Sequence, residues 1–184
     1  MATPRHDAIE RHYAALWGPV RGRLAWDRGP IHELPTGFEV LHFHRATDAS
    51  VHATCGMSTA EDAAPLELHL VTRRADAVRP ELVELLTVVA HYHRTGARLG
   101  LGDTVHFGRP YLPGATCEHA LISLPYLDGP TLEWMRAPRT RFLWLFPITP
   151  AELAFKKSRG ADALEARFEA AGVDYLDPRR ASVV

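Results

Sequence analysis

The stretch RFLWLFPITP, residues 141 to 150, constrains the fold more than any other part of this chain. Phe142 to Phe146 are all apolar, so both faces of the strand that they predict must be buried. We therefore expect a central strand of a sheet. Proline has no amide hydrogen to donate to a neighbouring strand, and so Pro147 predicts that strand pairing stops there.

A helix is predicted to begin directly after this strand. Thr149 and Glu152 have the spacing of a capping box, T-x-x-E, and Pro150 occupies the first helical position. This helix should end near Gly160. Residues 161–172 predict a second helix that stops at a glycine, so the chain should carry two C-terminal helices.

The remaining elements predict an α+β fold. An amphipathic N-terminal helix and a longer amphipathic helix that Pro80 begins both show apolar residues at helical spacing. Leu66, Leu68 and Leu70 alternate with Glu67 and His69, the pattern of a strand with one solvent-exposed face. The expected helices span 5–17 and 80–96, and the expected strands span 37–46, 51–57, 65–73 and 117–127. We expect one domain over residues 1–184, with a mixed or mainly antiparallel sheet covered by helices.

Composition excludes several classes of function. The net charge is −1, from 21 basic and 22 acidic residues, so no excess of positive charge is available for nucleic acid. No apolar stretch approaches the roughly 20 residues of a membrane span, and the first residues are charged where a signal peptide would be apolar. These features indicate a soluble cytoplasmic protein with no membrane partner. Cys55 and Cys117 are expected to be reduced rather than disulfide-bonded.

Eleven histidines raise the question of a metal site. His42 and His44 are two residues apart on a predicted strand, so both imidazoles should lie on one face and could chelate an ion. A complete site needs further ligands, which the local sequence does not supply. The glycine-rich run that contains Gly100 and Gly102 lacks the third glycine of a dinucleotide fingerprint. We expect no catalytic residues, no metal and no cofactor; the alternative hypothesis is a metal-dependent enzyme built on His42 and His44.

Three stretches in the second half of the chain resemble the suppressor-of-fused-like domain family, which occurs in an animal Hedgehog-pathway regulator and in stand-alone bacterial proteins. They are GDTVHFGRPYLPG at 102–114, HALISLPYL at 119–127 and FLWLFPITPAELAFKKSRGADAL at 142–164. The resemblance implies a protein-binding module without catalytic residues or a cofactor. In animals the domain joins a second one to clamp an extended peptide, largely by strand addition. In bacteria it implies an immunity-type protein that binds and neutralises a toxin domain.

The resemblance also implies two partner-binding residues. Asp103 matches an aspartate that follows a glycine, and Tyr92 matches a tyrosine late in the preceding helix. Each has a local alternative: Asp103 as a turn residue that bonds its own backbone, and Tyr92 as an aromatic at the edge of the core. We expect Asp103 to be exposed at a loop, because the neighbouring glycines permit a sharp turn.

Overall fold

The computed structural model describes residues 3–29, 33–76, 80–177 and 179–184. Within these residues one sheet runs through the molecule in the order β1-β2-β3-β4-β8-β6-β5, and β7 also pairs with β8. The strands are β1 (Gly22–Leu24), β2 (Glu39–His44), β3 (Ala49–Cys55), β4 (Leu66–Arg73), β5 (Thr104–His106), β6 (His119–Ser123), β7 (Trp134–Arg136) and β8 (Arg139–Ile148). The helices are α1 (Pro4–Trp17), α2 (Pro80–Thr95), α3 (Pro130–Glu133), α4 (Pro150–Arg159) and α5 (Ala161–Ala171). The α+β fold expected from the sequence is confirmed.

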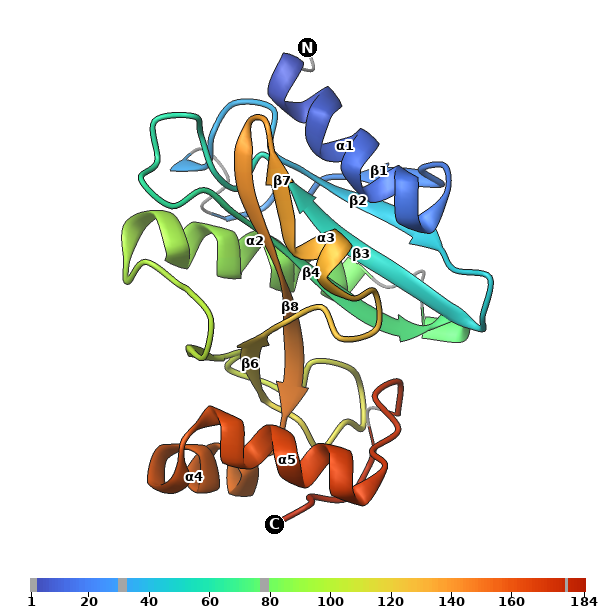
Figure 1. Cartoon of the computed structure of the whole chain (residues 1–184), viewed down its shortest axis with the longest axis vertical. Helices are drawn as coiled ribbons and strands as arrows, with labels where there is room; N and C mark the ends of the chain where they lie inside the picture. Colours follow the sequence, from blue (N-terminus) through green and yellow to red (C-terminus); the bar gives the residue numbers. More distant parts are fainter. Residues whose placement is uncertain (1–2, 30–32, 77–79, 178) are drawn as a thin grey trace.

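Strand β8 is central, as its apolar sequence predicts. It pairs in parallel with β4 and antiparallel with β6, while the other described pairs are antiparallel. In Figure 1 β8 runs down the middle of the molecule, from the end near α1 toward the end that α4 and α5 occupy. Phe142 and Trp144 belong to one apolar cluster, and Leu143 and Leu145 belong to the cluster on the other face. The strand therefore joins the two cores.

The prediction that pairing stops at Pro147 is wrong. Strand β8 continues to Ile148, and Pro147 lies opposite Ala120 of β6. The Pro147 carbonyl accepts a hydrogen bond from Arg180 Nη2 at 3.2 Å, so it points away from β6. The nitrogen of a strand residue points to the same side as its carbonyl. The amide that proline lacks is therefore not needed by β6, and the parallel partner β4 pairs with β8 only as far as Trp144.

Both faces of the sheet are covered by helices. Helix α2 buries the predicted stripe of Leu82, Leu85, Leu86, Val89 and His93. The four apolar side chains of this stripe pack in one cluster with the leucines of β4. The opposite cluster contains apolar residues of α1, α3 and α5. This arrangement leaves the leucine face of β4 in the core, as predicted.

The prediction of a solvent-exposed face on β4 is wrong, because Glu67 and His69 are 0% and 1% exposed. The Glu67 carboxylate accepts hydrogen bonds from the Thr54 hydroxyl at 2.6 Å and from the backbone N–H of Gly56, Met57 and Ser58. Burial raises the pKa of this carboxyl to about 7, and the hydrogen bonds from Thr54, Met57 and Ser58 partly oppose the shift. Burial lowers the pKa of His69 to about 3, so this imidazole is neutral. Glu67 and His69 can be buried because α1 covers this face of β4 and hydrogen bonds take the place of those that water would make.

The joint between β8 and α4 has the predicted capping box. Thr149 Oγ1 accepts from Glu152 N at 3.2 Å, and Glu152 Oε2 accepts from Thr149 N at 2.9 Å. Glu152 is 0% exposed and also accepts two hydrogen bonds from Arg180, which is 8% exposed. One carboxylate thus caps the helix and holds residue 180 against it.

Short elements were missed by the sequence patterns. Strands β1, β5 and β7 and helix α3 were not predicted, and the strand expected at 117–127 shortens to β6, because a turn at Pro125 follows it. Cys55 and Cys117 are buried free thiols, as expected. Of the helices described, none combines the length and apolar character needed to cross a lipid bilayer.

Candidate functional site

Strand β5 forms one edge of the sheet. Within the described residues it pairs with β6 alone. Ile122 N donates to Asp103 O at 2.8 Å and Phe107 N donates to Glu118 O at 2.9 Å, so the backbones of Asp103 and Phe107 face β6. Successive residues of a strand direct their backbone groups to alternate sides. The N–H and C=O groups of Thr104 and His106 therefore point outward, where they can pair with another strand.

Asp103 stands at the start of this edge and is exposed, as predicted. Its Oδ2 accepts a hydrogen bond from Gly100 N at 2.8 Å, and its own N–H donates to Gly100 O at 3.1 Å. The turn role considered for this residue is therefore present. It is compatible with partner binding, because the carboxylate is at the surface and one oxygen atom is used in the turn.

Tyr92 lies in the last turns of α2 and is 46% exposed, so it is not a core residue. Its ring packs over Gly96, where a Cβ atom would come within 2.8 Å of the ring. The absence of a side chain at Gly96 thus lets the tyrosine ring lie along the end of the helix. The shared role of Tyr92 and Asp103 in binding stays a prediction.

The segment between these two residues is held by defined hydrogen bonds. His93 Nδ1 accepts from Leu99 N at 2.9 Å, and Asp103 holds the next residue, Gly100. Burial, followed by the charge of Arg98, lowers the pKa of His93 to about 4. The imidazole is therefore neutral and able to accept the bond at neutral pH. The end of α2 and the start of β5 are thus connected through ordered backbone.

An apolar hollow lies beside the same turn. Its volume is about 150 Å³, and Gly100 and Leu101 line it together with Trp134, Arg139 and Arg141. The guanidinium groups of Arg139 and Arg141 lie 5.3 and 5.2 Å from the centre of the Trp134 ring. Leu101 and Trp134 are 44% and 42% exposed. Exposed aromatic and arginine side chains of this kind are frequent in protein interfaces.

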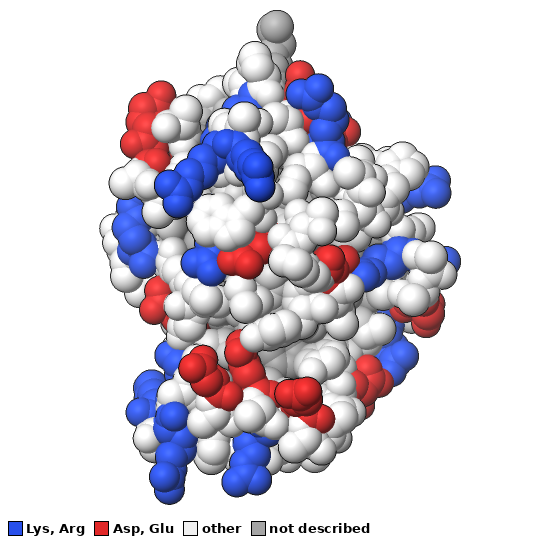
Figure 2. All heavy atoms as spheres, in the orientation of Figure 1, with Lys and Arg blue, Asp and Glu red and all other residues white. Residues whose placement is uncertain are grey.

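Acidic side chains of α5 lie near the other side of Asp103. A carbon added to Gly102 would be 4.0 Å from Ala161, the first residue of α5. Asp162, Glu165 and Glu169 of this helix line a hollow of about 590 Å³. Figure 2 shows acidic groups over the lower part of the molecule, where Figure 1 places α5, with basic groups beside and below them. The first turn of α5, which carries Asp162, therefore lies beside the start of β5.

His42 and His44 lie on one face of β2, as predicted, with ring centres 4.8 Å apart. His52 of β3 stacks on His42 at 4.8 Å. The described residues nevertheless contain a different group of three potential metal ligands with their donor atoms close together, namely His106, Glu118 and His119. The alternative hypothesis of an enzyme built on His42 and His44 gains no third ligand from the described residues.

Comparison with known proteins gives consistent matches. The sequence profile of the family described as Suppressor of fused protein (SUFU) matches residues 36–181. The chain is 30% identical to a SUFU homologue of Neisseria gonorrhoeae FA 1090 of known crystal structure, with a TM-score of 0.85 over 98% of this chain and 97% of that one. A search of curated protein sequences found no match.

Two more distant structures share the fold. The chain in the Sufu–Fu complex is 14% identical, with a TM-score of 0.74 over 98% of this chain and 92% of that one. Drosophila Suppressor of Fused is 14% identical, with a TM-score of 0.71, and the match covers 98% of this chain and 51% of that protein. At this level of identity the similarity concerns the fold.

Proposed function

This chain belongs to the suppressor of fused family, and from that premise we propose that it is a non-catalytic domain that binds another protein along the β5 edge. The observation that carries the proposal is the outward-facing backbone of Thr104 and His106, directly after the exposed Asp103. An extended segment of a partner can add to such an edge through backbone hydrogen bonds.

Charge suggests the chemistry of the bound segment. Asp103 contributes a carboxylate at the start of the edge, and α5 adds the carboxylates of Asp162, Glu165 and Glu169 nearby. Glu165 is partly engaged, because it accepts hydrogen bonds from Ser123 and Tyr126. Complementary charge favours association with a basic segment. We assign Tyr92 and the hollow beside Trp134 to the same surface, where they would contact apolar side chains of the partner.

The finer proposal is that the partner is a toxin domain and that this chain is a cytoplasmic immunity-type protein that neutralises it. Support comes from the similarity to a bacterial member of the family, the Neisseria homologue, of which the match spans 97%. An acidic edge suits the neutralisation of a basic toxin surface, because binding along it would cover that surface.

The test begins with affinity capture from the native host and continues with titration of the purified partner. Thr104→Pro removes an amide that faces outward and leaves the bonds to β6 in place, as proline does on edge strands. Thr104→Val is its control, because it keeps the backbone amide. Asp103→Arg reverses the charge at the start of the edge, and Asp103→Asn keeps an oxygen that can accept the Gly100 bond.

We expect Thr104→Pro and Asp103→Arg each to weaken binding by about 2 kcal/mol or more, roughly 30-fold in Kd. Thr104→Val should bind like the wild type. Thermal unfolding should place all the variants within about 1 kcal/mol of the wild type, because these positions are on the surface. Equal affinity for Thr104→Val and Thr104→Pro would reject strand addition.

The toxin proposal has its own assay. The captured partner, expressed alone, should arrest growth of a test strain, and co-expression of this chain should restore it. Asp103→Arg should restore growth less well than Asp103→Asn. A partner that causes no growth defect would exclude the immunity role and leave the binding role intact.

A further inference from the structure

Two histidines and a glutamate meet at one end of the β5–β6 ladder. His106 ends β5 and His119 begins β6, and these two residues are direct partners across the strands. Directly opposed residues of an antiparallel pair have their side chains on the same face. The imidazole centres are 4.5 Å apart, with 33° between the ring planes.

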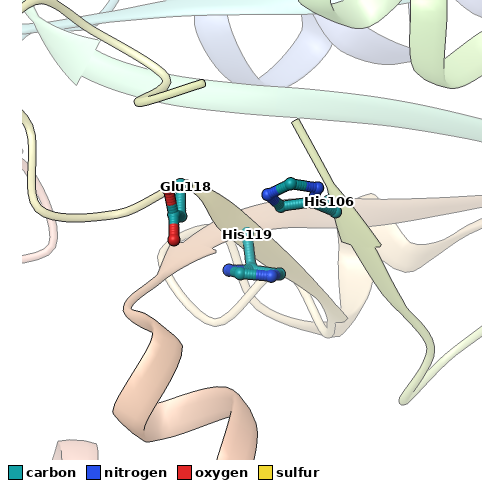
Figure 3. A group of neighbouring side chains, drawn as sticks. All are labelled: His106, Glu118 and His119. Atoms are coloured by element: carbon teal, nitrogen blue, oxygen red, sulfur yellow. The ribbon is translucent and has the colours of Figure 1, made fainter. Parts of the chain in front are cut away.

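Glu118 completes the group. One donor atom from each of His106, Glu118 and His119 lies within 4.8 Å of the others. Figure 3 shows the Glu118 carboxylate beside His119, with the His106 ring on the neighbouring strand. His106 is exposed, and the other two residues are partly buried. The group therefore opens to solvent on one side.

These donors have the character of a transition-metal site. Two imidazole nitrogens and one carboxylate oxygen are a ligand set that Zn²⁺ uses when it keeps an open position. Bonds of about 2.1 Å in tetrahedral geometry place neighbouring donor atoms about 3.4 Å apart. The side chains have to close by about an ångström, which rotation about their χ angles provides without movement of the strands.

The state of His119 favours ligation. Its Nδ1 is buried and makes no hydrogen bond within the described residues. Burial and then the neighbouring His106 lower the pKa of His119, while Glu118 opposes the shift and Lys157 adds to it. A buried ring nitrogen without a hydrogen-bond partner is available to bind a metal ion. Glu118 offsets the positive charge that Lys157 brings to the site.

We propose that His106, Glu118 and His119 bind one divalent transition-metal ion, with Zn²⁺ the best match, at the β5–β6 edge. Magnesium and calcium prefer an all-oxygen set, which this group does not offer. The ion would link the edge strand to β6 and present an open coordination position to solvent. The site is independent of the proposed partner, so binding can be measured with the purified chain alone.

The experiment titrates Zn²⁺ into the chelator-treated protein by calorimetry, with Co²⁺ absorption as a report of coordination geometry. We expect one equivalent of Zn²⁺ and a tetrahedral Co²⁺ spectrum. His106→Ala and Glu118→Gln should each weaken Zn²⁺ binding by at least about 10-fold, because each removes a ligand. His44→Ala is the matched control and should leave binding unchanged. Saturating Zn²⁺ should raise the Tm of the wild type and of His44→Ala, and not that of His106→Ala.

Several outcomes would overturn the site. The first is the absence of stoichiometric Zn²⁺ binding, and the second is an unchanged Zn²⁺ affinity in His106→Ala or Glu118→Gln. The third is loss of Zn²⁺ binding in His44→Ala, which would show that the ion binds at β2 instead. None of these results depends on a protein partner, so the proposed function is judged separately.

Discussion

Glu152→Gln is expected to lower the free energy of unfolding by about 3–5 kcal/mol, the usual cost of leaving a buried charge without its partner. Glu152 is 0% exposed, and its two oxygens accept bonds from Thr149 N, Val183 N and both terminal nitrogens of Arg180. A glutamine side chain keeps one of those oxygens. Its NH₂ group would face donors, and Arg180 would remain charged and 8% exposed.

Urea unfolding followed by tryptophan fluorescence measures the effect, since Trp144 is 2% exposed and close to this joint in β8. With a slope of about 2 kcal/mol per M, the unfolding midpoint should fall by roughly 2 M. The slope itself should not change. A loss below about 1 kcal/mol would show that Arg180 reaches solvent when its partner is neutralised, and would refute the argument.

The double variant Glu152→Gln with Arg180→Met separates charge from shape. Methionine has no charge and can occupy the space between Phe146 and Phe168, over which the Arg180 guanidinium lies at 5.5 and 5.3 Å. Removal of one charge of a buried ion pair leaves the other charge uncompensated, whereas removal of both charges does not. We therefore expect the double variant to be more stable than Glu152→Gln alone. Additive losses would contradict this reading.

Two further predictions concern the scaffold. Thr149→Ala should lower the free energy of unfolding by about 1 kcal/mol, because it removes the helix cap. Thr149→Ser should lower it by less, since the hydroxyl remains and only a buried methyl group is lost. Thermal unfolding of the two variants measures the difference. Glu67 has a pKa of about 7 in the folded protein, against an ordinary value of 4.5, so the folded state binds this proton more tightly than the unfolded state. The resulting contribution to stability is fully present below about pH 4.5 and is lost as the pH rises through 7. Over this range the contribution amounts to about 3 kcal/mol. His69 and His93, with lowered pKa values, act in the opposite direction, and the difference between the wild type and Glu67→Gln isolates the glutamate. Parallel pH profiles for the two proteins would show that Glu67 is ionised throughout.

The long elements could be predicted because their patterns are local. The stripe of α2, the capping box at Thr149 and the doubly apolar β8 each lie within a short window of sequence. Strands β1, β5 and β7 contain three residues each, too few to display a period. The burial of Glu67 could not be predicted from alternation, because its backbone donors come from residues 9 to 11 positions earlier.

In the candidate sites, too, features set by neighbouring residues could be predicted, and features set by strand pairing could not. The exposure of Asp103 follows from neighbouring glycines and was predicted. Its place at a sheet edge depends on the pairing of β5 with β6, which no local signal revealed. The cluster of His106, Glu118 and His119 depends on the same register. A strand assignment at Thr104–His106, paired with HALIS, would have been enough to suggest it.

The central position of β8 has a consequence for the order of assembly during synthesis. Strand β4 ends at Arg73, and its parallel neighbour begins at Arg139. At about 5–20 residues per second, the ribosome needs roughly 3 to 13 s to add the intervening stretch. During that interval the nascent β1–β4 meander has an open edge at β4, and the face that α2 covers stays apolar and exposed until α2 has been added. Chaperone holdases should therefore bind ribosome-bound chains of this length and release them once β8 has emerged.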